Sequence, residues 1–197
     1  MLFGEMSLTL DDVSCLLHLP IRGVFWPPQH ITKATVVGLV VDYLGVSQYR
    51  AQEHVRHCRG SYYKLECLYD LFKKYRAASR WGYATRAYLL MLVGSKIFVD
   101  KTFTLVDARY LLLFTDLDRL SGYSWGAAAL VTLYSHLGDA SMFSCKQLGG
   151  YHILLHCWIY EYFSTIEKRG ENWIPSQNCG LPRAMRWSYR RKLLSML

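Results

Sequence analysis

The chain has 197 residues, of which 52% are hydrophobic and 19% charged, a composition that excludes intrinsic disorder and fits one globular domain. The net charge is +8, which favours an anionic partner. The longest apolar run, residues 87–93, is far shorter than the roughly 18 residues of a membrane-spanning helix, so no membrane segment is expected.

The N-terminal segment is predicted to combine short β elements with one helix. Polar and apolar residues alternate over residues 5–10, which predicts a short strand. Thr9 and Asp12 then have the spacing of a capping box, which predicts that a helix begins there and ends before Pro20. We therefore expect a minor β element between residues 5 and 26.

The rest of the chain is predicted to be helical. Apolar residues at helical spacing predict helices over residues 36–44, 51–58, 65–75, 84–93, 106–117, 124–137 and 148–166. Residues 84–93 are nearly all apolar, which indicates a buried central helix. We expect one compact, mainly α-helical domain over residues 1–172, followed by a basic C-terminal appendage over residues 173–197.

The stretch YSWGAAALVTLYSHLGDA, residues 123–140, combines aromatic and small side chains, so it is either a binding site or a packing surface. Ser124 is expected to cap a helix on which Gly126 and Ala129 allow another helix to approach closely. We favour packing, because apolar stripes at helical spacing usually belong to the core. Trp125 is then predicted to be buried, and Trp125→Ala to cost about 3–5 kcal/mol.

Two basic regions alternate with Tyr and Trp. Residues 50–86 carry nine basic and three acidic side chains, and residues 183–197 carry five basic and none that are acidic. Such a mixture suits phosphate contacts combined with base stacking, and so a DNA or RNA partner. The candidate contacts are Arg50, Arg56, Arg59, Lys64, Lys73, Lys74, Arg183, Arg186, Arg190, Arg191 and Lys192. The alternatives are an anionic protein partner, and a nuclear import signal at residues 190–192.

Potential metal ligands are present, but without the spacing of a metal site. One group is His54, His57, Cys58 and Cys67, and a second is the pair His152 and His156. Neither matches the pattern of a closed tetrahedral zinc site, so no metal is expected. The six cysteines have no framework spacing either, which predicts reduced thiols in the cytosol or the nucleus.

Catalytic motifs are not found in the sequence. Asp116 and Asp118 are two residues apart and would point to different faces of a helix, so pairing with Arg109 and Arg119 is favoured over an acidic catalytic cluster. The sequence has no nucleophile elbow, no P-loop and no dinucleotide fingerprint. Lys96 is interpreted as a cation at a helix C-terminus rather than a Schiff-base lysine. We predict no catalytic residue, no cofactor and no enzymatic activity.

Four blocks together resemble the plant mobile domain, also labelled the aminotransferase-like plant mobile domain. They are GEMSLTLDDVSCLLHLPIRG (4–23), RAYLLMLVGSKIFVD (86–100), YLLLFTDLDRLSGYSWGAAALVTLYSHL (110–137) and QLGGYHILLHCWIYEYF (147–163). The resemblance covers nearly the whole chain, and it makes Asp116, Trp125 and Gly126 parts of a structural signature. A helical segment usually precedes the first block, so the N-terminal part of the family domain is expected to be missing.

The resemblance implies a mainly helical, transposon-derived nuclear domain. Family members occur in plant transposable elements and in host nuclear proteins linked to transposon silencing, control of gene expression and genome integrity, and some act with a phosphatase-like protein. We therefore expect a non-catalytic domain that works through protein or nucleic-acid contacts in these processes. The alternatives are a nucleic-acid-binding domain of a transposable-element protein and, less favoured because the residues do not support the aminotransferase-like label, an enzyme.

Overall fold

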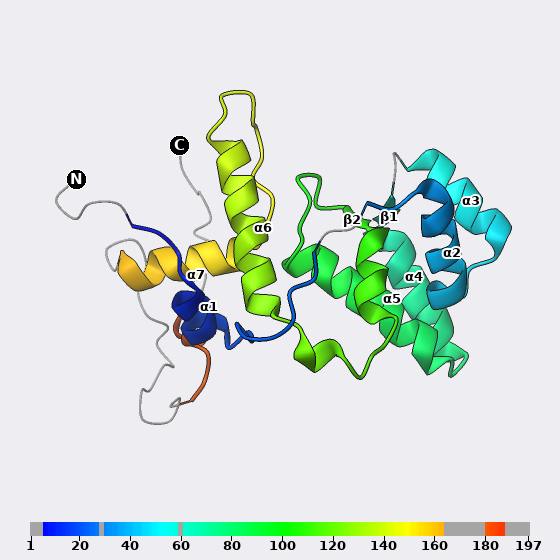
Figure 1. Ribbon diagram of the computed structural model, residues 1–197, viewed down its shortest axis with the longest axis horizontal. Coiled ribbons are helices and arrows are strands. Elements are labelled where there is room, and N and C mark those ends of the chain that lie inside the picture. The colour runs from blue at the N-terminus through cyan, green and yellow to red at the C-terminus, as the bar shows by residue number, and fades with distance from the viewer. Residues whose placement is uncertain (1–5, 28–29, 59–60, 164–179, 188–197) are drawn as a thin grey trace, which may run out of the picture.

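The computed structural model describes residues 6–27, 30–58, 61–163 and 180–187, and in this part the fold is mainly helical, as predicted (Figure 1). The α-helices are α1 (Leu10–Leu17), α2 (Lys33–Leu44), α3 (Gln48–His57), α4 (Leu65–Ala77), α5 (Trp81–Lys96), α6 (Trp125–Ala140) and α7 (His152–Tyr162). The 3-10 helices are η1 (Ala108–Phe114), η2 (Leu120–Gly122) and η3 (Arg183–Arg186), and the strands are β1 (Tyr62–Lys64) and β2 (Leu105–Asp107). Across the described helices, none combines the length and apolar character needed to cross a bilayer.

Local signals place the first two helices where the sequence predicts them. The Thr9 hydroxyl accepts a hydrogen bond from the Asp12 amide at 3.2 Å, and the Asp12 carboxylate accepts one from the Thr9 amide at 2.8 Å. This capping box begins α1. Helix α2 ends at Gly45, whose φ of 63° is the left-handed conformation that glycine adopts at low cost.

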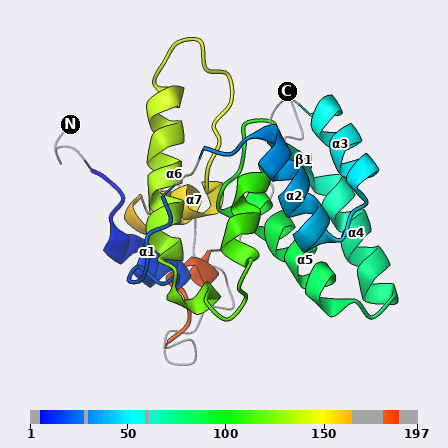
Figure 2. The ribbon, with the colours of Figure 1, turned by 45° about the vertical axis from the view of Figure 1, so that its right-hand side comes forward.

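Two hydrophobic clusters form the core, and Figures 1 and 2 show the helices that surround them. Core cluster 1 lies among α2, α3, α4, α5, the β strands and η1, and its fully buried side chains include Leu44, Leu90 and Phe114. Core cluster 2 lies among α1, α6 and α7, and includes Val13 and Leu133. The helices that pack around these two clusters carry the surface residues described below.

The two-stranded sheet lies outside the N-terminal range in which the β element is predicted. Strand β1 pairs antiparallel with β2, with Tyr63 opposite Val106. Near the N-terminus the described residues contain a single parallel bridge, between Val24 and Tyr123, and residues 6–9 form no strand. The alternation of polar and apolar residues in this segment has another cause. Leu8 is buried in core cluster 2, and its carbonyl accepts a hydrogen bond from the Tyr134 hydroxyl at 2.7 Å.

Two predicted helices are shorter than their apolar patterns. Val106 belongs to β2, and the helix after it is a 3-10 helix that begins where the Asp107 carboxylate accepts a hydrogen bond from the Arg109 amide. Helix α7 begins at His152 because Gly150, with φ of 83°, turns the chain just before it. Residues 164–166, the end of the predicted last helix, lie outside the described residues.

The start of α6 joins the two clusters. The Gly126 amide donates to the Pro20 carbonyl at 2.8 Å, and a Cβ at Gly126 would lie 3.0 Å from Ile21 and Val13. Ser124 does not cap α6 as predicted, because its hydroxyl donates to the Ile21 carbonyl instead. The small residues of α6 therefore let the N-terminal segment approach the helix closely.

Candidate interaction site

An apolar pocket of about 300 Å³ lies where the N-terminal segment, η1 and α6 meet. Its lining is Val24, Phe25, Trp26, Pro27, Phe98, Tyr110, Leu113, Tyr123, Ser124, Trp125, Ala127, Ala128, Val131 and Thr132. Three of these side chains are largely exposed, Val24 at 64%, Phe25 at 67% and Val131 at 66%. We call this feature the inter-cluster pocket. A hollow with this much aromatic and aliphatic lining is typical of a binding site.

Backbone and ring contacts hold the pocket open. The amide of Val24 donates to the Gly122 carbonyl at 2.8 Å, which fixes the N-terminal segment beside the start of α6. The Tyr110 ring stacks on Phe98 at 4.1 Å and contacts Trp26 at 5.8 Å between centroids. Burial raises the pKa of Tyr110 to about 12, so its phenol stays neutral at physiological pH.

Trp125 is half-buried rather than fully buried, because one side of its ring contributes to the pocket. Its indole nitrogen donates to the Leu120 carbonyl at 2.8 Å, and its ring stacks on Phe114 at 6.3 Å. The same stretch is thus both a packing surface and a pocket wall. Sequence reasoning missed the second role of Ala127 and Ala128, whose short side chains leave the space that the pocket occupies.

A more polar hollow of about 280 Å³ adjoins the inter-cluster pocket and shares part of its lining, including Thr132. Three of its charged groups, Lys101, Asp107 and Arg109, are held in ion pairs, and the Asp100 carboxylate accepts a hydrogen bond from the Thr102 amide. Arg109 donates to the buried carboxylate of Asp107 at 2.6 Å, and Lys101 lies 2.9 Å from Asp139. The carboxylates of Asp107 and Asp139 are therefore neutralised by their partners.

The potential metal ligands make other contacts in the fold. The His54 ring lies 3.3 Å from the Cys58 sulfur and stacks on Tyr63, and His152 contacts the Leu148 carbonyl. Within the described residues, no three His, Cys, Asp or Glu side chains are grouped closely enough to hold a metal ion. Burial raises the pKa of both the Cys58 and Cys67 thiols, the opposite of what a thiolate ligand or nucleophile requires.

Two histidines make the fold sensitive to acid. Burial lowers the pKa of His54, and the positive charges of Lys64 and His57 lower it further. Burial also lowers the pKa of His136, next to Lys101. The folded chain therefore binds protons at these two sites less readily than the unfolded chain. The neutral side chains of His54 and His136 contribute fully to stability above the unfolded histidine pKa of about 6.5. This contribution is lost as the pH falls below that value, because protonation then favours the unfolded chain.

We expect a lower melting temperature at about pH 5.5 than at about pH 7.5. Between these two pH values only histidines among the common side chains change charge. The double variant His54→Asn and His136→Asn is expected to show a smaller difference between the two pH values. His30→Asn, at an exposed position, serves as the control. An unchanged pH difference in the double variant would contradict this explanation. Differential scanning fluorimetry measures the melting temperature of each variant at both pH values.

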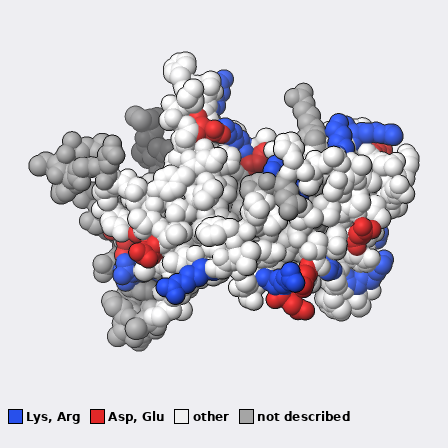
Figure 3. All heavy atoms as spheres, in the orientation of Figure 1, with Lys and Arg blue, Asp and Glu red and all other residues white. Residues whose placement is uncertain are grey.

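The described candidates for nucleic-acid contact lie on several different elements. Arg50 and Arg56 lie on α3, Lys64 on β1, and Lys73 and Lys74 on α4, all exposed. On the face drawn in Figure 3, basic side chains form separate groups over α3 and over the far end of α4 and α5. Four further candidates lie outside the described residues: Arg59, Arg190, Arg191 and Lys192.

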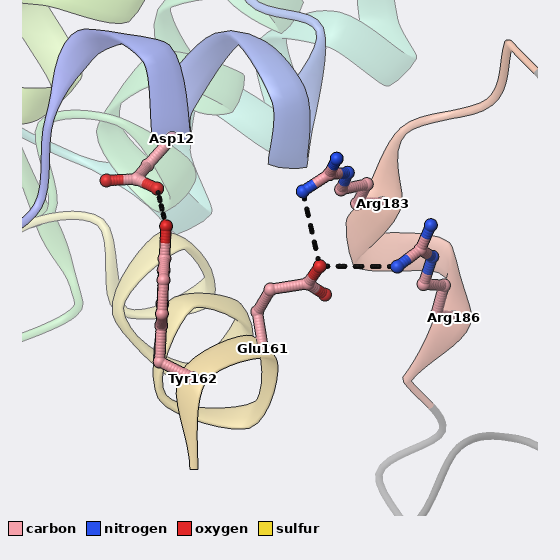
Figure 4. Close-up of polar contacts among 5 residues, drawn as sticks. All are labelled: Asp12, Glu161, Tyr162, Arg183 and Arg186. Atoms are coloured by element: carbon pink, nitrogen blue, oxygen red, sulfur yellow. Dashed lines mark hydrogen bonds and ion pairs between the residues drawn. The ribbon is translucent and has the colours of Figure 1, made fainter. Parts of the chain in front are cut away.

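Arg183 and Arg186 of the predicted appendage are held against the helical domain (Figure 4). Both donate to one carboxylate oxygen of Glu161 on α7, at 3.3 and 3.2 Å. Nearby, the Tyr162 hydroxyl donates to the Asp12 carboxylate at 2.7 Å, which ties α7 to α1. The two arginines thus fasten η3 to α7, a role that the acid-free sequence around them does not reveal.

The acidic and basic residues of the signature region pair locally. Asp116 lies 3.2 Å from Arg119, as the sequence predicts, and its second oxygen accepts a hydrogen bond from the Asp118 amide. Lys96 lies in the last turn of α5, where a cation interacts favourably with the helix dipole. The contacts of Asp116 lie within the turn between η1 and α6, whereas Lys96 lies at the end of α5.

A sequence-family model matches nearly the whole chain. The family model described as "Plant mobile domain" matches residues 1–196. The chain belongs to the plant mobile domain family. No solved structure matches this plant mobile domain at a significant level.

Three relatives come from Arabidopsis thaliana. The chain is 38% identical over 164 residues to Protein MAIN-LIKE 2, covering 82% of the chain and 24% of that protein. It is 34% identical over 164 residues to Protein MAINTENANCE OF MERISTEMS, covering 80% of the chain and 32% of that protein. It is 32% identical over 161 residues to Serine/threonine-protein phosphatase 7 long form homolog, covering 80% of the chain and 12% of that protein. This plant mobile domain therefore spans a third or less of each of these relatives.

Proposed function

We propose that the chain is a non-catalytic nuclear interaction domain whose inter-cluster pocket binds a phosphatase-like protein, and that it acts in transposon silencing, gene-expression control or genome maintenance. The observation that carries this proposal is the pocket itself. Val24, Phe25 and Val131 expose apolar surface around an aromatic hollow that the rest of the described chain leaves uncovered. Exposed apolar surface of this kind is usually covered by a partner.

The chemistry of the neighbouring groups supports binding rather than catalysis. Asp107, in the adjoining hollow, is in an ion pair with Arg109. Farther from the pocket, burial raises the pKa of the thiols of Cys58 and Cys157. A catalytic site would instead need a base or nucleophile whose pKa is adjusted toward reactivity. Hydrophobic contact with a partner requires none of these groups.

The choice of a phosphatase-like partner rests on one relative. In the long-form homologue of serine/threonine phosphatase 7, a segment similar to this chain occupies 12% of a longer polypeptide. A domain that shares a polypeptide with a phosphatase is suited to contact it. We propose that this chain makes the corresponding contact between separate molecules, with an apolar side chain of the partner entering the inter-cluster pocket.

Val131→Asp is expected to weaken this complex by about tenfold or more, because a carboxylate buried in an apolar contact loses its hydration without a compensating partner. Val131 is largely exposed on α6, so the fold should remain intact. The measurement is a calorimetric titration of the complete chain with the purified phosphatase region of the Arabidopsis long-form homologue.

Tyr49→Asp is the matched control, because Tyr49 is equally exposed on α3, outside the pocket. It should bind like the unmodified chain. Equal weakening by Val131→Asp and Tyr49→Asp would contradict the assignment of the pocket. No binding of the phosphatase region by the unmodified chain would contradict the proposed partner.

A further inference from the structure

The free end of the α4–α5 hairpin concentrates positive charges on aromatic rings. Every cation–π contact that the described residues show involves a cation from residues 73–86. They are Lys73 over Tyr69 at 4.5 Å, Lys74 over Tyr75 at 5.4 Å, Arg76 over Phe72 at 5.7 Å, Arg80 over Tyr75 at 5.5 Å and over Tyr83 at 4.7 Å, and Arg86 over Tyr43 at 5.5 Å. Such contacts occur about once per 70–80 residues in proteins generally, so this hairpin end is unusual.

Most of this charge is not neutralised. Residues 73–86 contain five Lys and Arg and no Asp or Glu. Lys73 pairs with Asp70 at 3.0 Å, while the Arg86 guanidinium donates to backbone carbonyls, including that of Phe114 at 2.8 Å. Within residues 73–86, the exposed cations that make no ion pair with the described part of the chain are Lys74, Arg76 and Arg80.

An exposed tryptophan lies beside these cations. Trp81, the first residue of α5, is 62% exposed, although tryptophan is usually well buried. It lines a hollow of about 360 Å³ together with Tyr43, Tyr83, Arg80 and Asp42. The rings of Tyr75 and Tyr83 hold the Arg80 guanidinium in place, so that its donors are ordered before any ligand arrives.

We propose that Lys74, Arg76, Arg80 and Trp81, which we call the cation–aromatic cluster, bind single-stranded nucleic acid. An unpaired base stacks on the Trp81 ring, and the phosphates on either side of it contact Arg80 and the cations of α4. The Asp42 carboxylate in the same hollow accepts a hydrogen bond from the edge of a base and disfavours a phosphate there. Single strands are favoured over duplexes because stacking on Trp81 requires an unstacked base.

A phosphorylated peptide is the other polyanionic ligand that the cations would suit. It would leave the exposed face of Trp81 without a role, so we favour the nucleic acid. The turn between α4 and α5, where the cluster lies, is well separated from α6 (Figures 1 and 2), whose residues line the inter-cluster pocket. This proposal goes beyond the proposed function and does not depend on it, so either can fail alone.

The test is a fluorescence anisotropy titration of the complete chain with labelled oligothymidylate of about 15 nucleotides, at about 50 and about 200 mM NaCl. Trp81→Ala is expected to weaken binding by about tenfold, as for the loss of one stacked base. Arg80→Gln is expected to weaken binding and to reduce the steepness of the log–log salt dependence by about 0.7, the value for one lost contact to a single strand.

The matched controls are Phe143→Ala, which removes a fully exposed ring from the loop after α6, and Arg119→Gln, which removes an exposed charge near η2. Both should bind as the unmodified chain does, and circular dichroism should show that all four variants are folded. The proposal is overturned if oligothymidylate does not bind at the lower salt concentration, or if a matched duplex binds more tightly. It is also overturned if the controls lose as much affinity as the test variants, or if only a phosphopeptide binds.

Discussion

Phe114→Ala is expected to lower the free energy of unfolding by about 3–5 kcal/mol, the range for removing a fully buried aromatic side chain. Phe114 ends η1, is completely buried in core cluster 1, and stacks on Trp125 at the start of α6. Its loss leaves a cavity in core cluster 1, and it also removes a ring from the junction between the clusters. Urea unfolding followed by circular dichroism measures the change.

Phe143→Ala is the control for this variant, because Phe143 is fully exposed in the loop after α6. Its stability should stay within about 0.5 kcal/mol of the unmodified chain. A Phe114→Ala variant as stable as Phe143→Ala would show that the packing described around η1 is wrong. A separate, earlier unfolding transition in Phe114→Ala would indicate that the two clusters unfold independently.

Gly94→Val is expected to destabilise the fold by about 3 kcal/mol, at the upper end of the range for overpacked cores. Gly94 lies on the buried face of α5, and a Cβ there would lie 2.5 Å from the Cβ of Val106 on β2. Neither α5 nor β2 can move away without disturbing core cluster 1. The penalty should outweigh the better helix propensity of valine, which is worth only a few tenths of a kcal/mol.

Gly38→Val is the control for Gly94→Val, because a Cβ at Gly38 on α2 has no neighbour within 4 Å. Its stability should be unchanged or slightly higher, and the same urea unfolding experiment compares the two variants. Similar effects of the two substitutions would mean that α5 does not contact β2 as closely as described.

Features that depend on residues three or four apart could be predicted from the sequence. The capping box of Thr9 and Asp12, the end of α2 at Gly45 and the pairing of Asp116 with Arg119 all have this character. In each case both partners lie within one turn, so their spacing alone determines whether they meet.

Features that join distant segments could not be predicted in this way. Tyr63 and Val106 pair across the sheet although 43 positions separate them, and no local periodicity specifies that partner. The ion pair between Glu161 and Arg183 also joins distant segments, because it forms only when η3 packs on α7. The inter-cluster pocket exists because residues 24–27 lie beside the start of α6, which the alanines of α6 do not reveal.

The most direct test of the proposed interaction is hydrogen–deuterium exchange of the complete chain, with and without the phosphatase region of the Arabidopsis long-form homologue. If the inter-cluster pocket is the binding site, amides in residues 24–27 and 123–132 should exchange more slowly in the complex, while those of α3 and of the α4–α5 turn should not change. Unchanged exchange at residues 24–27 and 123–132, with slowed exchange confined to residues 73–86, would contradict the account.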